Sequence, residues 1–323
     1  DNSGYGIYQL QDHQTPPLTG NTISGNNIAL RIPFSAFPDS TNTIEQNTQQ
    51  YISLLANTIT EDITIPVWNQ GELDEIATYY VTDAWIDVPF DRIVTVNPGV
   101  VLKFQTSGFR TDGRLIANGT LEQPVVFTSY RDAKAGVDSD GNASELAQPG
   151  DWYGLNFNDS LFEAQNLLNH SIVRYGGSST AGVYANYSDL TVKNSEISNN
   201  RNQGIYIRSA SPVVTGNDIW GNTAQGIYIR DAASNPTVSF NRISSNQSHG
   251  VELQSSSNAD LTNNQIYLNR GYGVLNNTGN LVDATNTWWG DTDASGPYHA
   301  TNLTGIGNQV SDKIILDNTM RFP

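Results

Sequence analysis

Cysteine is absent from the 323-residue sequence, and methionine occurs only once. These absences exclude disulfide scaffolds, thiol catalysis and cysteine-based zinc sites. Charge is also scarce, since 15% of the residues are charged against roughly 25% in an average globular domain. Basic residues are fewer than acidic ones: the chain has 16 Lys and Arg and 32 Asp and Glu, which gives a formal net charge of −16. Phosphate backbones are bound by clustered basic side chains, so we expect no nucleic-acid partner.

Long hydrophobic runs are missing as well. No stretch of about 18 consecutive apolar residues occurs, so we expect no membrane-spanning segment. Small polar residues are abundant instead, with 36 Asn and 28 Gly. Such residues disfavour long helices and favour turns, which argues against an all-α or a doubly wound α/β fold. An acidic, cysteine-free composition with few Lys is common in secreted and cell-surface proteins, and we expect one of these locations.

An internal repeat is present between residues 182 and 290. Five segments open with a glycine and continue with apolar residues at alternate positions, at spacings of 22, 22, 24 and 23 residues. Alternation predicts strands in which Ile205 and Ile207 face a core while Tyr206 and Arg208 face water. The five glycines are Gly182, Gly204, Gly226, Gly250 and Gly273.

A second pattern, Asn-x-Ile-x-x-Asn, recurs with the same period at 217–222, 241–246 and 264–269. The apolar runs are too short for helices and are separated by Asn, Gly and Ser turns. A parallel β-coil explains both patterns, because successive coils stack about 4.8 Å apart and place equal positions above one another. We therefore expect ladders in which each Asn amide bonds the Asn of the next coil.

These repeats resemble the right-handed parallel β-helix superfamily, which includes the pectate-lyase-like proteins. The upstream segments 93–104, 113–132 and 150–157 are similar to those that open such helices in large bacterial and archaeal secreted or cell-surface proteins. The closing segment 286–314 resembles their last coil. The resemblance implies an all-β fold, a single-stranded right-handed parallel β-helix. At about 22 residues per coil, the chain would form roughly 14 coils.

We interpret residues 1–323 as one elongated β-helix domain. Because a repeat-like segment already stands at 4–10, the chain reads as if it began in the middle of a solenoid. An uncapped solenoid end exposes sheet edges, so we expect either end-to-end self-association or continuation of a longer chain. The expected parts are initial coils at 1–37, a loop or short helix at 38–58, irregular coils at 59–157 with an acidic loop at 131–151, regular coils of 22–24 residues at 158–290, and a closing coil at 291–323.

The acidic loop carries the strongest local group of possible metal ligands. Oxygen-bearing side chains at alternate positions, with Gly141 among them, resemble a calcium loop. The match to an EF-hand is partial, because position 12 counted from Asp138 is Pro149 and not a bidentate Glu. The alternative is a solvated acidic turn. The candidate calcium ligands are Asp138, Asp140, Asn142, Asp132, Glu145 and Asp151.

A second candidate site is a column of outward side chains on the regular coils. Stacked aromatic rings beside Arg donors suit a carbohydrate, since rings cover the apolar face of a sugar and guanidinium groups bind carboxylates. An acidic polysaccharide or a cell-surface glycan would fit. The alternative is stacking that only stabilises the sheet. The candidate carbohydrate-binding residues are Tyr184, Tyr206, Tyr228, Arg208, Arg230 and Glu252.

Catalytic signatures known from β-helix enzymes are missing from the sequence, and we assign no catalytic residue. His249 beside Glu252, with Arg230 one coil earlier, is the one acid/base grouping on the regular coils. In the closing coil, Asp291 and His299 suit turn formation or a weak cation site. We expect a non-catalytic extracellular module: a rigid stalk, adhesin or structural subunit, stabilised by calcium and in contact with carbohydrate. The alternative is a lyase or epimerase acting on uronate-containing glycans, although the net charge of −16 would repel them.

Overall fold

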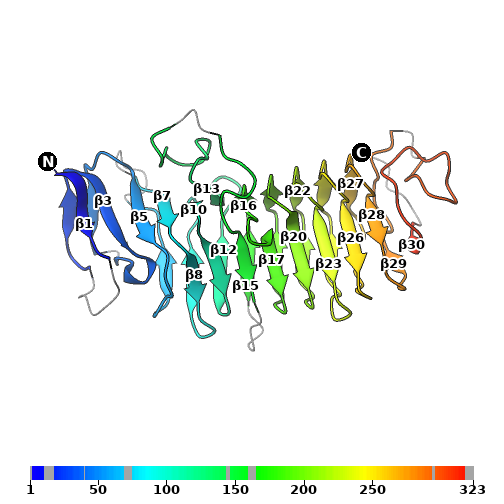
Figure 1. Ribbon diagram of the computed structural model, residues 1–323, viewed down its shortest axis with the longest axis horizontal. Helices are drawn as coiled ribbons and strands as arrows, with labels where there is room; N and C mark the ends of the chain where they lie inside the picture. Colours follow the sequence, from blue (N-terminus) through cyan, green and yellow to red (C-terminus); the bar gives the residue numbers. More distant parts are fainter. Residues whose placement is uncertain are drawn as a thin grey trace.

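The computed structural model describes residues 2–10, 18–39, 41–68, 75–142, 146–158, 165–292 and 295–316. In these residues the chain forms 30 strands and one short 3-10 helix, η1 (Phe34–Ala36). Figure 1 shows the strands stacked side by side along one long axis, with the N-terminal coils at one end and the C-terminal coils at the other. No helix of the described residues is long and apolar enough to cross a membrane.

Three long parallel sheets form the faces of the rod. Sheet 1 has eleven strands in the order β1 (Asn2–Tyr8), β3 (Asn26–Pro33), β5 (Tyr51–Leu55), β7 (Thr78–Thr82), β10 (Val101–Gln105), β13 (Val125–Ser129), β16 (Ser171–Arg174), β19 (Glu196–Ser198), β22 (Asp218–Trp220), β25 (Arg242–Ser244) and β27 (Gln265–Tyr267).

Sheet 2 has eight strands: β8 (Trp85–Val88), β11 (Gly108–Thr111), β14 (Leu155–Phe157), β17 (Ala181–Asn186), β20 (Gln203–Arg208), β23 (Ile227–Arg230), β26 (Val251–Gln254) and β28 (Val274–Asn276). Sheet 3 has seven: β6 (Ile63–Ile65), β9 (Ile93–Val96), β12 (Arg114–Asn118), β15 (Asn166–Asn169), β18 (Leu190–Lys193), β21 (Val213–Thr215) and β24 (Thr237–Ser239). Two pairs lie toward the ends: β2 (Thr22–Ser24) with β4 (Thr43–Glu45), and β29 (Val282–Asp283) with β30 (Ile314–Ile315).

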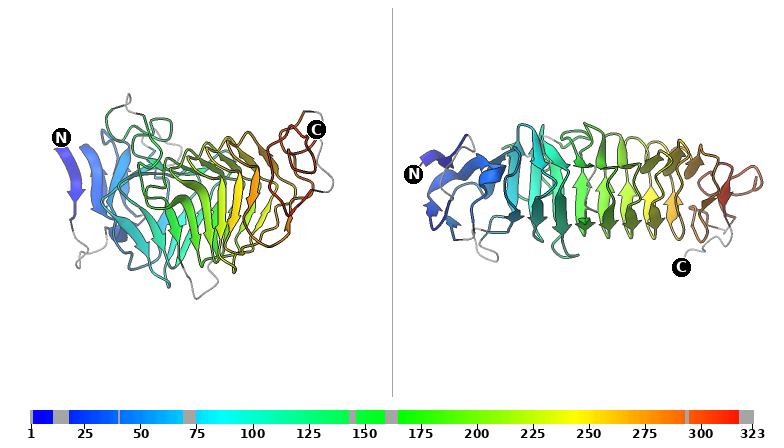
Figure 2. Two further views of the ribbon diagram at one scale, coloured as in Figure 1. Left: turned by 45° about the vertical axis from the view of Figure 1, so that its right-hand side comes forward. Right: turned by 90° about the horizontal axis from the view of Figure 1, so that it is seen from below.

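From β7 to β25, consecutive strands run through the three sheets in turn, so that each of these coils adds one strand to each face. β16, β17 and β18 lie in sheets 1, 2 and 3, and β19 returns to sheet 1 beside β16. The views in Figure 2 follow these coils along the rod. The prediction of an all-β parallel solenoid is thus confirmed.

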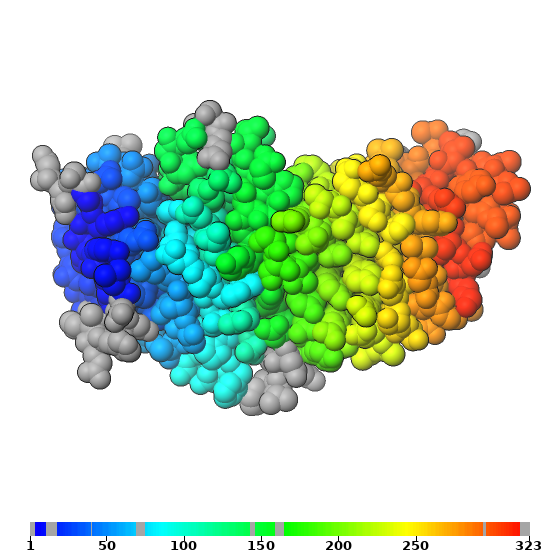
Figure 3. All heavy atoms as spheres, in the orientation of Figure 1, coloured from blue at the N-terminus to red at the C-terminus, as the bar shows by residue number. Residues whose placement is uncertain are grey.

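The coil count differs from the prediction. Sheet 1 contains eleven strands, which corresponds to about eleven coils rather than roughly 14. Long connections account for the difference, because they use residues without adding a strand to sheet 1. One of them lies between β13 and β14, where the acidic loop intervenes, and another lies between β29 and β30. Figure 3 shows the acidic loop, in green, as a protrusion from the side of the rod.

The segment 38–58 was expected to be a loop or short helix, and this prediction is wrong. It contains β4 and β5, and β5 pairs with β3 and β7 in sheet 1. Ile52 and Leu54 of β5 are fully buried. Two apolar side chains at alternate positions therefore gain more from joining the core than the surrounding polar residues gain from a solvated loop.

The core is a set of apolar columns, one residue per coil. Ile205, Ile227 and Val251 lie in register in sheet 2, and each is at most 1% exposed. Their neighbours Ile207 and Ile229 form a second buried column. The predicted alternation of buried and outward positions is confirmed in these strands.

Asparagine ladders close the corners between the sheets, as predicted. Asn200 donates through Nδ2 to Oδ1 of Asn222 (3.1 Å), Asn222 donates to Asn246 (2.9 Å), and Asn246 donates to Asn269 (2.9 Å). A parallel ladder joins Asn217, Asn241 and Asn264. These amides are buried, and each also donates to a backbone carbonyl of the preceding coil, so their hydrogen-bonding capacity is satisfied without water.

One backbone position at this corner adopts a left-handed conformation in coil after coil. The residues that follow β7, β10, β16, β19, β22, β25 and β27 of sheet 1 have positive φ angles, which turn the chain sharply toward sheet 2. Asn and Gly suit this conformation, whereas Leu is strained in it. After the last four of these strands, the residues are Asn199 (φ 52), Gly221 (φ 66), Ser245 (φ 56) and Leu268 (φ 54).

Candidate functional site

The predicted tyrosine column lies on the outer face of sheet 2. Tyr184 pairs with Tyr206, and Tyr206 pairs with Tyr228, in the register of β17, β20 and β23. The ring centroids are 4.8 Å apart for the first pair and 5.0 Å for the second, with interplanar angles of 31° and 45°. All three side chains are half-buried, whereas the apolar residues on either side of each tyrosine face the core. The column therefore offers a row of tilted rings to solvent, as the sequence predicted.

The arginines beside this column are engaged with a carboxylate. Nε of Arg208 lies 3.1 Å from Oδ2 of Asp231, and Nε of Arg230 lies 3.5 Å from Oδ1 of the same residue. Arg208 also lies over the ring of Tyr187, with its Cζ 5.6 Å from the ring centroid. Burial raises the pKa of Tyr184 and Tyr228, so both phenols stay neutral near neutral pH. The two guanidinium groups share the carboxylate of Asp231, and Glu252, which follows Tyr228 in register, supplies the second negative charge, so that these four side chains carry no net charge.

Glu252 continues the column but is not an exposed carboxylate. It is 6% exposed and follows Tyr228 in the register of β26. Its carboxylate accepts hydrogen bonds from Nε2 of Gln225, from Nε2 of Gln254 (2.5 Å) and from Nδ2 of Asn277 (3.4 Å). This acid therefore ties three neighbouring amides together.

His249, the partner of Glu252 in the predicted acid/base grouping, has a structural contact of its own. Its Nδ1 accepts a hydrogen bond from the backbone N–H of Tyr272, 2.9 Å away in the next coil. Burial lowers the pKa of His249. The ring is thus held neutral as an acceptor, and this contact joins two coils.

The acidic loop is folded on its own backbone amides. Oδ1 of Asp138 accepts hydrogen bonds from the N–H groups of Asp140 (3.2 Å) and Gly141 (3.1 Å), and Oδ1 of Asp140 accepts from the N–H of Asn142 (2.9 Å). A side-chain hydrogen bond with Asp140, together with these backbone N–H groups, lowers the pKa of Asp138. The alternate spacing of the oxygen ligands is therefore used within the loop to form two turns.

Asp132 and Asp151 anchor the two ends of this loop. Asp132 is 3% exposed and pairs with Nε of Arg174 at 2.7 Å. Asp151 pairs with Arg131 at 3.2 Å and accepts from Oγ of Ser129 at 2.7 Å. Glu145 lies outside the described residues. Within the described ranges, no three acidic or histidine side chains are grouped so that they could hold a metal ion.

A buried lysine beneath the acidic loop was not predicted. Lys103 lies in β10 with 0% exposure, and its Nζ donates to the carbonyl oxygen of Val137 at 2.5 Å. Burial lowers the pKa of Lys103, and the charges of Asp132, Asp138 and Asp140 oppose that effect. The ammonium group therefore supplies a positive charge inside the loop. The sequence feature that could have predicted this residue is a lysine at an outward position within the apolar run VLKF.

The closing coil uses its polar residues for local contacts. Oδ2 of Asp291 accepts from the N–H of Gly296 at 3.0 Å, and Asp291 is 3% exposed. His299 approaches Oδ1 of Asp312 through Nε2 at 3.2 Å and Oγ1 of Thr301 through Nδ1 at 2.8 Å. These contacts fit the turn-forming interpretation of both residues.

Comparison with known proteins agrees with this geometry. Residues 153–288 match the family model of the right handed beta helix region. In the described residues the parallel solenoid continues on both sides of the matched segment, which is consistent with the right-handed parallel β-helix superfamily. Neither the curated proteins nor the solved structures contain a significant match to this sequence.

Proposed function

We propose that this chain is a non-catalytic, rigid β-helix module of a secreted or cell-surface protein, and that its tyrosine column contacts glycans. The main support for a non-catalytic role is that the polar side chains make structural contacts between neighbouring coils. The side chains best suited to acid/base chemistry, His249 and Glu252, are engaged in contacts that join one coil to the next. Such contacts suit a stalk, an adhesin or a structural subunit.

Rigidity is supported by the continuity of the stack. The ladder from Asn200 to Asn269 passes through four coils and ends on Oδ1 of Asn308, 3.1 Å from Nδ2 of Asn269. Buried, satisfied amides fix the register of neighbouring coils, because a slip would leave donors and acceptors unpaired. Self-association through β1, the edge strand of sheet 1, or continuation into a longer chain belongs to the same proposal.

The tyrosine column supports contact with carbohydrate. Three rings in register present apolar faces and phenol groups over three adjacent coils, which is the combination that sugar rings and hydroxyls require. Because Asp231 and Glu252 together balance the charges of Arg208 and Arg230 and the whole chain carries a formal charge of −16, we expect neutral glycans to bind this column better than uronates.

The experiment is a glycan-binding assay on the wild type and on Tyr206→Ala/Tyr228→Ala. We expect the double variant to lose about tenfold or more in affinity, because two aromatic platforms are removed. Phe240→Ala is the matched control, since Phe240 is 66% exposed and lies outside the column. Equal binding by the wild type and the double variant would exclude the column as a glycan contact.

A polysaccharide-active enzyme is the second candidate. Glu196 of β19 and Asp218 of β22 are paired in register, so two carboxylates lie on adjacent coils of sheet 1. Asp218 is, however, bound through both oxygens by Arg242. Incubation with pectate, alginate and chondroitin, monitored by the ultraviolet absorbance of unsaturated products, tests for a lyase, and NMR of the incubated alginate tests for an epimerase, which forms no double bond. Product formation would overturn the non-catalytic proposal.

A further inference from the structure

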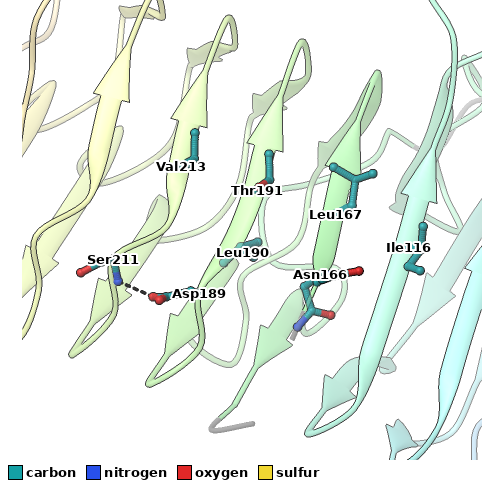
Figure 4. A pocket seen from close by; sticks show the side chains of 9 residues that line it. Ile116, Asn166, Leu167, Asp189, Leu190, Thr191, Ser211 and Val213 are labelled. Atoms are coloured by element: carbon teal, nitrogen blue, oxygen red, sulfur yellow. Dashed lines mark hydrogen bonds between the residues drawn. The ribbon is translucent and has the colours of Figure 1, made fainter. Parts of the chain in front are cut away.

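An open groove lies on the outer face of sheet 3, away from the tyrosine column of sheet 2. It has a volume of about 600 Å³ and crosses four neighbouring strands, β12, β15, β18 and β21. Figure 4 shows its side chains, which are contributed at equivalent positions by successive coils. The lining residues that carry the argument are Ile116, Leu167, Thr191, Val213, Asp189 and Ser211.

The floor of the groove is a mainly aliphatic column. Ile116 pairs with Leu167, Leu167 with Thr191, and Thr191 with Val213. These four side chains face outward from their strands, and Val213 is 42% exposed. Three inter-strand spacings of about 4.8 Å give the floor a length of about 14 Å. Aliphatic side chains in this arrangement form a continuous apolar strip along the rod.

A polar column runs beside this strip. Gln165, Asp189 and Ser211 each stand two residues before a floor residue, and all three line the groove. Oδ1 of Asp189 accepts the backbone N–H of Ser211 at 2.5 Å, which fixes the carboxylate at the rim (Figure 4). The rim therefore offers an amide, a carboxylate and a hydroxyl, one from each successive coil.

The charge of the groove restricts its ligand. Its lining contains one carboxylate, Asp189, and no Lys, Arg or His. The whole chain carries a formal charge of −16. Anionic ligands are therefore disfavoured at this surface, whereas groups that donate hydrogen bonds to a carboxylate are favoured.

We propose that this groove binds a neutral linear glycan that runs along the axis of the rod with about one sugar per coil. The spacing of the coils is close to the length of one β-linked hexose unit, so each sugar would meet one floor position and one rim position. The C–H face of each ring would lie on the aliphatic strip, and its hydroxyls would bond the rim. This site is independent of the tyrosine column, which lies on another sheet.

The test is titration of the full chain with cellohexaose, xylohexaose and mannohexaose, with hexagalacturonate as the anionic comparison. We expect at least one neutral hexamer to bind and hexagalacturonate to bind at least tenfold more weakly. In Leu167→Asn/Val213→Asn the neutral hexamer should bind about tenfold more weakly, because the apolar contact of the floor is lost. Both side chains point away from the core, and thermal melting checks that the variant is folded.

Two controls separate this site from its surroundings. Thr237→Asn changes the next exposed position of the same outward column, which is not part of the groove lining, and should bind as the wild type does. The floor substitutions are also compared in the Tyr206→Ala/Tyr228→Ala background, where a further loss of affinity reports on the groove and not on the tyrosine column. The proposal is overturned if no neutral hexamer binds, if the floor variant binds as tightly as the wild type, or if the galacturonate binds best.

Discussion

Replacing Asn222 with Ala tests the asparagine ladder most directly. Its buried amide makes four hydrogen bonds: Oδ1 accepts from N (3.0 Å) and Nδ2 (3.1 Å) of Asn200, and Nδ2 donates to Oδ1 of Asn246 (2.9 Å) and to the carbonyl oxygen of Ile197 (3.1 Å). Each bond contributes about 1 kcal/mol net, and a buried donor left without a partner costs about 1–3 kcal/mol. The expected loss in the free energy of unfolding is about 3–5 kcal/mol.

Urea denaturation followed by circular dichroism measures this loss. Asn118→Ala is the control, because Asn118 is exposed and accepts one ladder-type bond, from Nδ2 of Asn169 at 2.8 Å; we expect less than about 1 kcal/mol there. Asn222→Asp sharpens the test, since its carboxylate would face two acceptors in a buried site. Burial beside two acceptors should raise the pKa of the introduced carboxyl in the folded state, so this variant should become more stable as pH falls through the raised pKa. A loss below about 1 kcal/mol in Asn222→Ala would refute the ladder as a stabilising element.

Three further predictions concern the acidic loop and the lysine beneath it. Lys103→Met should loosen residues 131–142, because the bond from Nζ to Val137 is lost and the nearby carboxylates lose their cation; faster hydrogen exchange in this loop checks it, and unchanged protection would contradict it. The pKa of Lys103 is lowered from 10.5 in the folded state, so the folded protein loses this proton at a lower pH than the unfolded chain does. The wild type should therefore gain stability relative to Lys103→Met as pH rises toward about 10.5. The predicted calcium site is tested by melting with and without EDTA: binding predicts a lower midpoint with EDTA in the wild type and no change in Asp138→Asn/Asp140→Asn, whereas equal midpoints for the wild type would exclude it.

The regular coils could be predicted from the sequence because their physical cause is local and periodic. Alternating apolar residues determine which face of a strand is buried, and the constant spacing of 22–24 residues places Tyr206 above Tyr184 and Asn222 above Asn200. The same reasoning failed at 38–58, where Ile52 and Leu54 stand among polar residues and only their pairing with neighbouring strands reveals a buried strand. The local pattern does not reveal that such a segment is a buried strand, because the residues that bury it are distant in the sequence.

The partners of the charged side chains could not be predicted for a related reason. Asp231 follows β23 in a turn outside the repeat, so its position between Arg208 and Arg230 depends on the path of that turn. The role of Lys103 depends on a loop that returns more than thirty residues later. The groove on sheet 3 escaped notice because its floor residues, such as Leu167 and Val213, occupy outward positions where alternation predicts only exposure.

The stacking of coils has a consequence for how such a protein can change in length. Each strand of sheet 2 between β11 and β26 pairs only with the equivalent strands of the coils before and after it. Duplication or deletion of one whole coil would preserve both junctions, provided that its corner asparagines are retained. The length of the rod could therefore change in steps of one coil, each about 4.8 Å, while surfaces several coils away keep their local geometry.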